Sequence, residues 1–188
     1  MKDLNIILQK CLNSDRVAQH KLYDFTYSNL ITAVALYTKD KTEQDWVFNL
    51  GMLKVFSSLD KYQLGTNYLG WARTILVRSA IDHIRHNKRY KDMLAPVEID
   101  EREVNVSALN DALNTLENES LIRLIQSIPE NERLIFTMYE IDGYSHAEIE
   151  KITTINKNTS KWLLSKARKS LQQNAVKFFD LKLKQNGK

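Results

Sequence analysis

Apolar residues recur at the spacing of an α-helix through most of this chain, and this spacing limits the folds that it can adopt. Two segments carry apolar side chains at positions i, i+4, i+7, i+8 and i+11, as one face of a helix does. The first has them at Tyr23, Tyr27, Leu30, Ile31 and Val34, and the second at Phe48, Met52, Val55, Phe56 and Leu59. The 188 residues include only five Gly and two Pro, and runs of alternating β-branched residues are few. The pattern therefore predicts an all-α protein.

The N-terminal part is predicted to form one small helical bundle. The two periodic segments supply its first two helices, and a third is expected to run from near Tyr68 to about Arg89. Together these three helices would form a domain over residues 1–91.

Residues 92–119 differ from the rest of the chain in both pattern and charge. Their apolar periodicity is weak and Pro96 interrupts any helix, so we predict a linker with one short helix near residues 108–116. The linker has 1 basic and 8 acidic side chains, whereas residues 1–91 have 14 and 8, and residues 120–188 have 12 and 7. Basic domains bind polyanions through counterion release, and an acidic linker is repelled by the same polyanion. The charges therefore predict two domains that bind a polyanion and a connector that does not contact it.

A second small helical bundle is predicted over residues 120–178. Helical periodicity returns at Leu121 and resumes after Pro129, which suits the first turn of a helix. Residues 179–188 are expected to form a disordered basic tail.

The second bundle ends in the pattern of a helix-turn-helix. Ser145 and Glu148 have the spacing of a capping box, so a short helix is expected to start at Ser145 and to end near Ile152. After a break, Asn156 is a good N-cap for a final helix that runs to about Phe178. A short helix, a tight turn and a longer helix are the layout of a DNA-binding motif.

One face of the final helix is expected to pack and the other to bind DNA. The packed face would consist of Ser160, Leu164, Ala167 and Leu171. The opposite face carries polar and basic side chains near the helix start, where a recognition helix enters the major groove, and further basic ones that suit phosphates. The candidate DNA contacts are Lys157, Asn158, Thr159, Lys161, Trp162, Ser165, Lys166, Arg168 and Lys169. An ordinary amphipathic helix with a solvated face is the alternative that this pattern leaves open.

A basic stripe beside aromatic residues makes the N-terminal bundle a second candidate nucleic-acid site. Arg78, Arg85 and Arg89 share one face of the predicted third helix. Aromatic rings in or just after a loop with two Gly residues could stack on unpaired bases, or they could belong to the core. The candidates are Tyr62, Tyr68, Trp71, Arg73, Arg78, Arg85, Lys88 and Arg89.

The sequence contains no pattern of catalysis or metal binding. It has no Gly-rich phosphate loop, and its four His residues are scattered. The single Cys, Cys11, excludes an internal disulfide and is expected in the core. There is no signal-peptide pattern and no apolar stretch of about 18 residues. We therefore expect a cytoplasmic protein that is not an enzyme, uses no metal or cofactor and does not bind a membrane.

Two stretches together resemble the extracytoplasmic-function family of bacterial RNA polymerase sigma factors. The first comprises residues 54–56, 59–62, 70–71, 80–85 and 88–89 and resembles sigma domain two. The second comprises residues 128–130, 133, 143–149, 158–159 and 165–169 and resembles sigma domain four. The resemblance extends over residues 17–175, with the acidic linker between the two stretches.

This resemblance implies a function in transcription initiation. Domain two of such a factor grips the clamp helices of core RNA polymerase and melts the minus-10 promoter element, whereas domain four meets the polymerase flap and reads the minus-35 element. The candidates of the N-terminal bundle would then contact minus-10 DNA, and those of the final helix minus-35 DNA. The linker would thread toward the RNA exit path. Core RNA polymerase and promoter DNA are the implied partners, and an anti-sigma factor is a further candidate.

The chain departs from this family in the helix that binds the clamp. Relatives carry a polar, charged set before the residue equivalent to Gly51, where this chain has Trp46, Asn49 and Leu50. Together with Leu53, these residues are the predicted polymerase contacts, and the apolar ones are expected to form a stripe opposite the core. Either the polymerase contact is more hydrophobic here, or another protein covers this face. Arg78 stands where relatives have Asn, which affects minus-10 base choice.

Domain four departs in its helix-turn-helix. Thr154 replaces the usual turn Gly, and Ser160 replaces a buried aliphatic residue. Trp162 and Leu163 occupy positions expected to face DNA, so direct base reading is predicted to be weak. Three interpretations remain open: a self-sufficient sigma factor, a divergent one positioned by a separate RNA-guided DNA-targeting partner, and a dimeric helix-turn-helix regulator that never contacts polymerase. An anti-sigma or other adapter fits less well, because it has no need of two basic domains.

Overall fold

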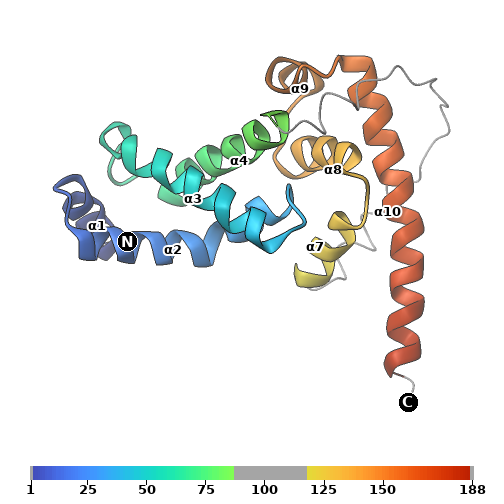
Figure 1. Ribbon diagram of the computed structural model, residues 1–188, viewed down its shortest axis with the longest axis horizontal. Helices are drawn as coiled ribbons and strands as arrows, with labels where there is room; N and C mark the ends of the chain where they lie inside the picture. Colours follow the sequence, from blue (N-terminus) through green and yellow to red (C-terminus); the bar gives the residue numbers. More distant parts are fainter. Residues whose placement is uncertain (1, 87–117, 187–188) are drawn as a thin grey trace. The chain divides into compact units, whose positions relative to one another are not determined.

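The computed structural model describes residues 2–86 and 118–186, and every regular element in these ranges is a helix (Figure 1). The predicted all-α class is therefore confirmed. The chain divides into two compact units, Met1–His86 and Asn87–Lys188. The predicted linker lies outside the described residues except at its last two positions, and so does its short helix near 108–116. No helix within the described ranges is long and apolar enough to cross a membrane.

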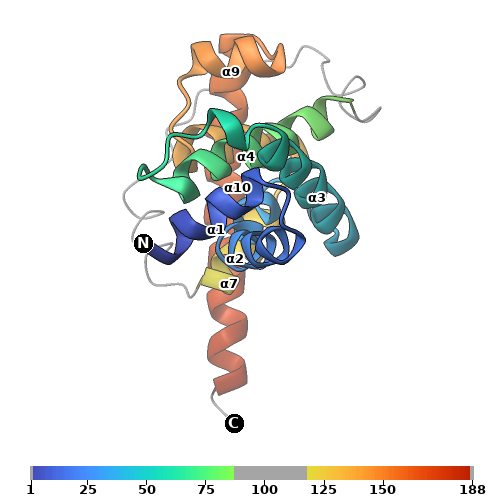
Figure 2. The same cartoon turned by 90° about the vertical axis from the view of Figure 1, so that its left-hand side faces the viewer.

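The described part of the N-terminal unit has one α-helix more than the three that were expected. Its described elements are α1 Lys2–Leu12, α2 Arg16–Ala35, α3 Lys41–Ser57, the 3₁₀ helix η1 Leu59–Lys61 and α4 Tyr68–His86 (Figures 1 and 2). The additional helix, α1, is held by Leu8 and Cys11, which are 1% and 5% exposed. Its short apolar run therefore belongs to the core, and Cys11 is a buried core residue as predicted.

Local sequence explains where α2 and α3 begin, and long-range packing joins them to α4. The side chain of Asp15 accepts from the backbone N–H of Ala18 at 3.0 Å, and that of Asp40 accepts from the N–H of Glu43 at 2.8 Å, so both helices have an aspartate N-cap. The core of the unit includes the fully buried side chains of Leu22, Phe48, Met52, Leu76 and Ile81. These side chains come from α2, α3 and α4, which pack against one another.

Gly51 lets α3 and α4 approach each other closely. A Cβ at this position would lie 2.5 Å from Cδ2 of Leu76 and 3.3 Å from its Cα. Leu76 is fully buried, so its side chain has no space to move into. The absence of a side chain at Gly51 therefore sets how the outer surface of α3 lies relative to α4.

The C-terminal unit carries a long final helix. Its described elements are α7 Asn118–Gln126, α8 Glu130–Phe136, a π-helical turn Thr137–Ile141, α9 His146–Thr153 and α10 Lys157–Asn186. The helix α7 begins inside the predicted linker. Figures 1 and 2 both show the end of α10 extending past α7.

The prediction of a disordered tail from residue 179 is wrong for residues 179–186, because α10 continues through them. The reason lies in the composition of the segment. Leu, Lys and Gln are good helix formers, and the first Gly after Leu171 is Gly187. Nothing in the sequence stops the helix earlier.

Candidate nucleic-acid interface

The predicted helix-turn-helix is formed by α9, the turn after it and α10. The hydroxyl of Ser145 accepts from the N–H of Glu148 at 3.3 Å, and the Glu148 carboxylate accepts from the N–H of Ser145 at 2.8 Å, which completes the capping box. The side chain of Asn156 accepts from the N–H of Thr159 at 2.8 Å and caps α10. Thr154 has a φ of 67°, in the left-handed region that Gly adopts without strain. The turn therefore has the geometry of a turn with Gly, although a β-branched residue occupies it.

The packed face of α10 is the predicted one, but it is wider than expected. The exposed fractions of Ser160, Leu164, Ala167 and Leu171 are all 4% or less. Leu163 is also buried, at 6% exposure, so the expectation that it faces DNA is wrong. The physical reason is that α10 packs against both α8 and α9, which together cover a broader arc of its surface than one stripe.

His146 ties α9 to α10 and to the π-helical turn. Its Nδ1 lies 2.8 Å from Oγ of Ser160, and its ring stacks on Tyr139 with the centroids 4.5 Å apart. Ser160 is fully buried, so this hydrogen bond satisfies a hydroxyl that water does not reach. Burial, followed by the charges of Lys161 and Arg168, lowers the pKa of His146 and favours the neutral ring.

Most of the candidate DNA contacts on α10 reach solvent. The exposed ones are Lys157, Asn158, Lys161, Lys166 and Lys169, and the half-buried ones are Thr159, Trp162, Ser165 and Arg168. The first of them stand at the N-terminus of α10, where the helix dipole favours phosphate. Lys166 Nζ lies 4.9 Å from the centroid of the Trp162 ring, which is a cation–π contact.

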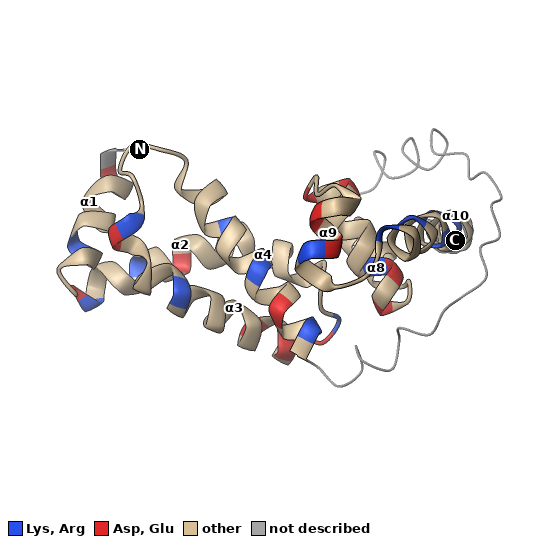
Figure 3. Ribbon diagram, turned by 90° about the horizontal axis from the view of Figure 1, so that it is seen from above, with Lys and Arg blue, Asp and Glu red and all other residues tan. Residues whose placement is uncertain are grey.

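Two basic candidates of α10 are paired within the unit. Nζ of Lys166 lies 3.3 Å from a carboxylate oxygen of Glu132, and Nε of Arg168 donates to Glu140 at 2.9 Å. Glu132 is only 2% exposed, and its other oxygen accepts from the hydroxyl of Ser170 at 2.8 Å. Figure 3 shows the basic residues along α10 in blue. A phosphate that approaches this part of the helix must compete with carboxylates already in place.

Two aromatic candidates of the N-terminal unit are core residues, so their interpretation as stacking platforms is wrong. Tyr62 and Tyr68 are 8% and 2% exposed, and their rings meet edge to face with the centroids 5.8 Å apart. The hydroxyl of Tyr62 donates to the backbone oxygen of Thr66 at 2.6 Å, and that of Tyr68 lies 2.8 Å from Oγ1 of Thr26. Burial raises the pKa of Tyr68 to about 12. Trp71 is half-buried against both rings and is the aromatic candidate that keeps an accessible surface.

Three basic candidates of this unit lie along α4. Arg78 is exposed and Arg73 and Arg85 are half-buried, whereas Lys88 and Arg89 lie outside the described residues. A guanidinium nitrogen of Arg85 is 3.4 Å from Asp82, and the same carboxylate is 3.4 Å from Nζ of Lys54. Asp82 therefore offsets part of the positive charge of this stripe.

The four predicted polymerase contacts lie on the outer side of α3. We call this surface the α3 face, and it consists of Trp46, Asn49, Leu50 and Leu53. Trp46 and Leu53 are 51% and 65% exposed, and Leu50 is half-buried. The side chain of Asn49 accepts from the hydroxyl of Tyr23 at 2.7 Å. The apolar stripe is thus present on the surface, and its partner stays a prediction.

Sequence patterns did not indicate the residues that support Trp46. The centroid of its indole lies 4.9 Å from that of the His83 ring, and Nε2 of His83 lies 2.7 Å from Oε1 of Glu43. His83 is 40 positions after Glu43 in the chain, and only the packing of α3 on α4 brings them together. The spacing of Glu43 and Trp46, one turn apart on α3, is the sole local signal of this cluster.

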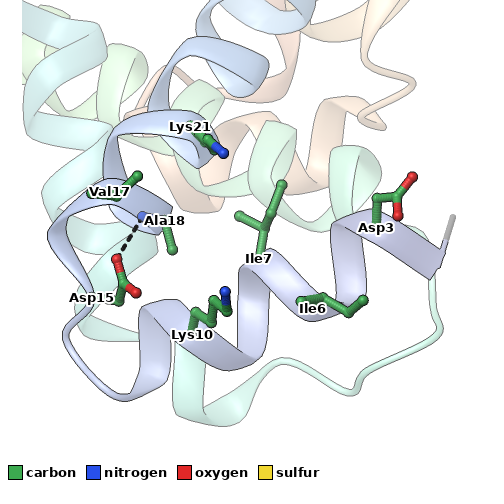
Figure 4. Close-up of a pocket in the computed structure, with 8 residues that line it drawn as sticks. All are labelled: Asp3, Ile6, Ile7, Lys10, Asp15, Val17, Ala18 and Lys21. Atoms are coloured by element: carbon green, nitrogen blue, oxygen red, sulfur yellow. Dashed lines mark hydrogen bonds between the residues drawn. The ribbon is translucent and has the colours of Figure 1, made fainter.

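A separate small pocket lies between α1 and the start of α2 (Figure 4). It has a volume of about 270 Å³ and is lined by Asp3, Ile6, Ile7, Lys10, Asp15, Val17, Ala18 and Lys21. Asp15 is already engaged as the N-cap of α2. Charges of both signs line the pocket, so its electrostatics favour neither anions nor cations, and none of the candidate DNA contacts lines it.

Comparison with known proteins finds one family match, and it lies in the C-terminal unit. Residues 118–171 match the family described as sigma-70, region 4. Among solved structures, one of CnrH in complex with the cytosolic domain of CnrY is similar with a TM-score of 0.45 and 14% identity, over 90% of this chain and 94% of that one. Another, of the sigma factor RpoE in complex with the anti-sigma factor NepR from Bartonella quintana, gives 0.38 and 16%, over 92% and 94%. No curated protein sequence matches the chain.

The matched residues extend from α7 into α10. They begin at the first residue of α7, include the whole helix-turn-helix and end at Leu171, the last residue of the predicted packed face. Residues 118–171 are therefore similar to sigma-70 region 4, and the resemblance to sigma factors that the motifs indicated is confirmed.

Proposed function

We propose that this chain is a sigma factor of the extracytoplasmic-function kind, which binds core RNA polymerase in the cytoplasm and directs initiation at specific promoters. The observation that carries the proposal is the match of residues 118–171 to sigma-70 region 4, on a helix-turn-helix whose second helix exposes cations at its N-terminus. Such a factor supplies binding and strand opening and performs no catalysis of its own. An anti-sigma partner stays a prediction from the sequence resemblance.

The C-terminal unit would bind the minus-35 element through the first turns of α10. Lys157, Asn158 and Lys161 are exposed there, and side chains at the start of a recognition helix reach base edges and phosphates in the major groove. Lys166 and Arg168 would contribute less, because each already has a carboxylate partner.

The N-terminal unit would contact and open the minus-10 element. Trp71 has a partly accessible ring for stacking on an unpaired base, and Arg73, Arg78 and Arg85 on the same helix would bind phosphates. Tyr62 and Tyr68 would support Trp71 from inside the core. The four residues of the α3 face would contact the clamp helices of core polymerase.

Transcription in vitro tests this function directly. Core polymerase of the source organism is incubated with fragmented genomic DNA, with and without the chain, and the 5′ ends of the transcripts are sequenced. New discrete start sites that share upstream sequence elements are the expected result. A chain that fails to bind core polymerase, and that forms dimers on gel filtration, would instead be a stand-alone helix-turn-helix regulator.

A second function is favoured by the ion pairs of α10. Because Glu132 and Glu140 hold Lys166 and Arg168, these two cations of α10 are less available to DNA, and a separate DNA-targeting protein could position the factor instead. In that case the chain co-purifies with core polymerase but yields no defined start sites on its own. Start sites that appear only after a targeting partner is added would establish this second function.

A further inference from the structure

Two residues outside the α3 face, His83 and Glu43, form the cluster that supports Trp46. We infer that His83, held by Glu43, is a positioning residue that fixes Trp46 as the anchor by which the α3 face binds core RNA polymerase. This inference rests on the proposed function and adds to it a residue of α4 and a residue at the start of α3. Both would act through Trp46.

Trp46 needs such support because it projects into solvent. It is 51% exposed, and it is the bulkiest of the large exposed apolar side chains among the described residues. A side chain that is mobile before binding loses its rotamer freedom on binding, which opposes association. The His83 ring, with its centroid 4.9 Å from that of the indole and the two planes tilted by 59°, limits this freedom in advance.

His83 is itself fixed from the other side. Its side chain is 19% exposed, and its Nε2 lies 2.7 Å from the Glu43 carboxylate, which is 33% exposed. Glu43 stands in the first turn of α3, where its N–H donates to the cap residue Asp40 at 2.8 Å. A continuous set of contacts therefore runs from the rigid start of α3 through α4 to the exposed indole.

The surroundings of Trp46 suit a protein partner better than a nucleic acid. Leu50 and Leu53 extend the apolar surface, and the nearby polar groups are already paired, as in the contact of Lys54 with Asp82. An apolar centre inside a polar rim is the usual anatomy of a protein interface, and Trp is enriched among its energetic hot spots.

A double-mutant cycle on binding to core polymerase tests the inference. With the full-length chain, Trp46→Ala should weaken binding about 30-fold, the size of a hot-spot loss. His83→Ala should weaken it about fivefold, and the double variant should bind no worse than Trp46→Ala, because a residue that acts through Trp46 has no effect once Trp46 is gone. Val17→Ala and His20→Ala, two changes at exposed positions of α2, should bind like the original chain.

A spectroscopic measurement checks the positioning without polymerase. In a chain with Trp71→Phe and Trp162→Phe, Trp46 is the only tryptophan. His83→Ala should then lower the fluorescence anisotropy of Trp46, whereas His20→Ala should leave it unchanged. Thermal unfolding followed by circular dichroism confirms that each variant is folded.

The possible failures differ from one another. If the folded original chain does not bind core polymerase, the proposed function fails and the inference fails with it. If the chain binds and Trp46→Ala binds equally well, the inference alone is overturned. It is overturned too if His83→Ala causes the same loss with and without Trp46, since His83 would then act independently.

Discussion

The two candidate binding surfaces would bind their partners by opposite physical means. The α3 face exposes apolar side chains, of which Leu53 is 65% exposed, and the charged groups beside it are paired with each other. The α10 surface presents cations, and carboxylates of its own unit hold two of them. Apolar burial is little affected by salt, whereas lysine–phosphate contacts weaken steeply as salt rises. The α3 face thus suits a protein partner. The α10 surface suits a polyanion, and the carboxylates of its own unit limit how strongly it would bind one.

The largest effect is expected from a change that disturbs the support of the α3 face. Gly51→Ala places a Cβ 2.5 Å from the buried side chain of Leu76. Overpacking of this kind costs roughly 1–3 kcal/mol, more than the gain in helix propensity, and we expect a net loss of about 2 kcal/mol in the unfolding free energy. Chemical denaturation followed by circular dichroism measures this loss.

Gly70→Ala is the matched control for the glycine of α3. A Cβ at Gly70 would meet only the exposed side chain of Asn67, 3.0 Å away at Nδ2. This side chain also accepts from the N–H of Gly70 at 3.1 Å, and a shift of a few tenths of an ångström would relieve the contact and keep the bond. Its effect should therefore be well below that of Gly51→Ala. Equal effects of the two changes would mean that α3 and α4 do not approach as closely as described.

Removal of exposed cations from α10 should produce the next largest effect. It should lower the affinity for DNA and leave the affinity for core polymerase unchanged. For holoenzyme on a promoter with a minus-35 element, Lys157→Ala with Lys161→Ala should lower affinity about tenfold and reduce the salt slope by about 2. Binding of the chain to core polymerase should stay the same. Lys10→Ala with Lys21→Ala removes the same charge from the N-terminal unit and should alter neither quantity; a similar loss of DNA affinity would point to a general charge effect.

Sequence patterns predicted local features well and long-range contacts poorly. The capping box at Ser145 and the cap at Asn156 depend on neighbours in the chain, so their spacing was sufficient. The burial of Tyr68 depends on Thr26, 42 positions earlier, and no periodicity could decide between a core ring and a stacking platform. The carboxylate partner of Arg168 is likewise 28 positions away. Because the sequence pattern does not reveal this partner, it predicted that Arg168 contacts phosphate.

The turns of the two units offer a smaller test, since each contains a residue at positive φ. Thr154, in the helix-turn-helix, has a φ of 67°, and Ser14, between α1 and α2, has 60°. The β-branched residue is the more strained there, so Thr154→Gly should stabilise the chain by about 1 kcal/mol and Ser14→Gly by less. Denaturation midpoints compare the two; a loss of stability in Thr154→Gly would show that the Thr side chain makes a favourable contact at the turn.

Release of a paired cation should make the α10 surface bind DNA more strongly. Glu140→Gln removes the charge that holds Arg168, and an ion pair near a protein surface contributes about 0.5 kcal/mol. We therefore expect promoter affinity to rise two- to threefold, with a steeper salt dependence. Glu119→Gln is the control, because its partner Arg123 is exposed on α7 and is not one of the candidate DNA contacts. Unchanged affinity in Glu140→Gln would mean that Arg168 does not reach phosphate even when freed.

The smallest expected effect is a dependence of the stability of the C-terminal unit on pH, caused by His146. Its lowered pKa means that the folded unit takes up a proton less readily than the unfolded chain, so the stabilising contribution is complete above the ordinary value of 6.5 and declines as pH falls below it. With Trp162 as the only tryptophan, its fluorescence should report a lower denaturation midpoint near pH 5.5 than near pH 7.5. His146→Asn keeps a group that can form a hydrogen bond with Ser160 but cannot titrate, so it should remove this pH dependence.

Glu148 contributes to the pH dependence of stability at a lower pH. Its hydrogen bonds to Ser145 lower its pKa, and the stabilisation is lost only as pH falls below the ordinary value of 4.5. The contributions of His146 and Glu148 can therefore be told apart by the pH at which each is lost. Persistence of the decline in His146→Asn would assign it to other groups and leave the His146–Ser160 contact without a part in it.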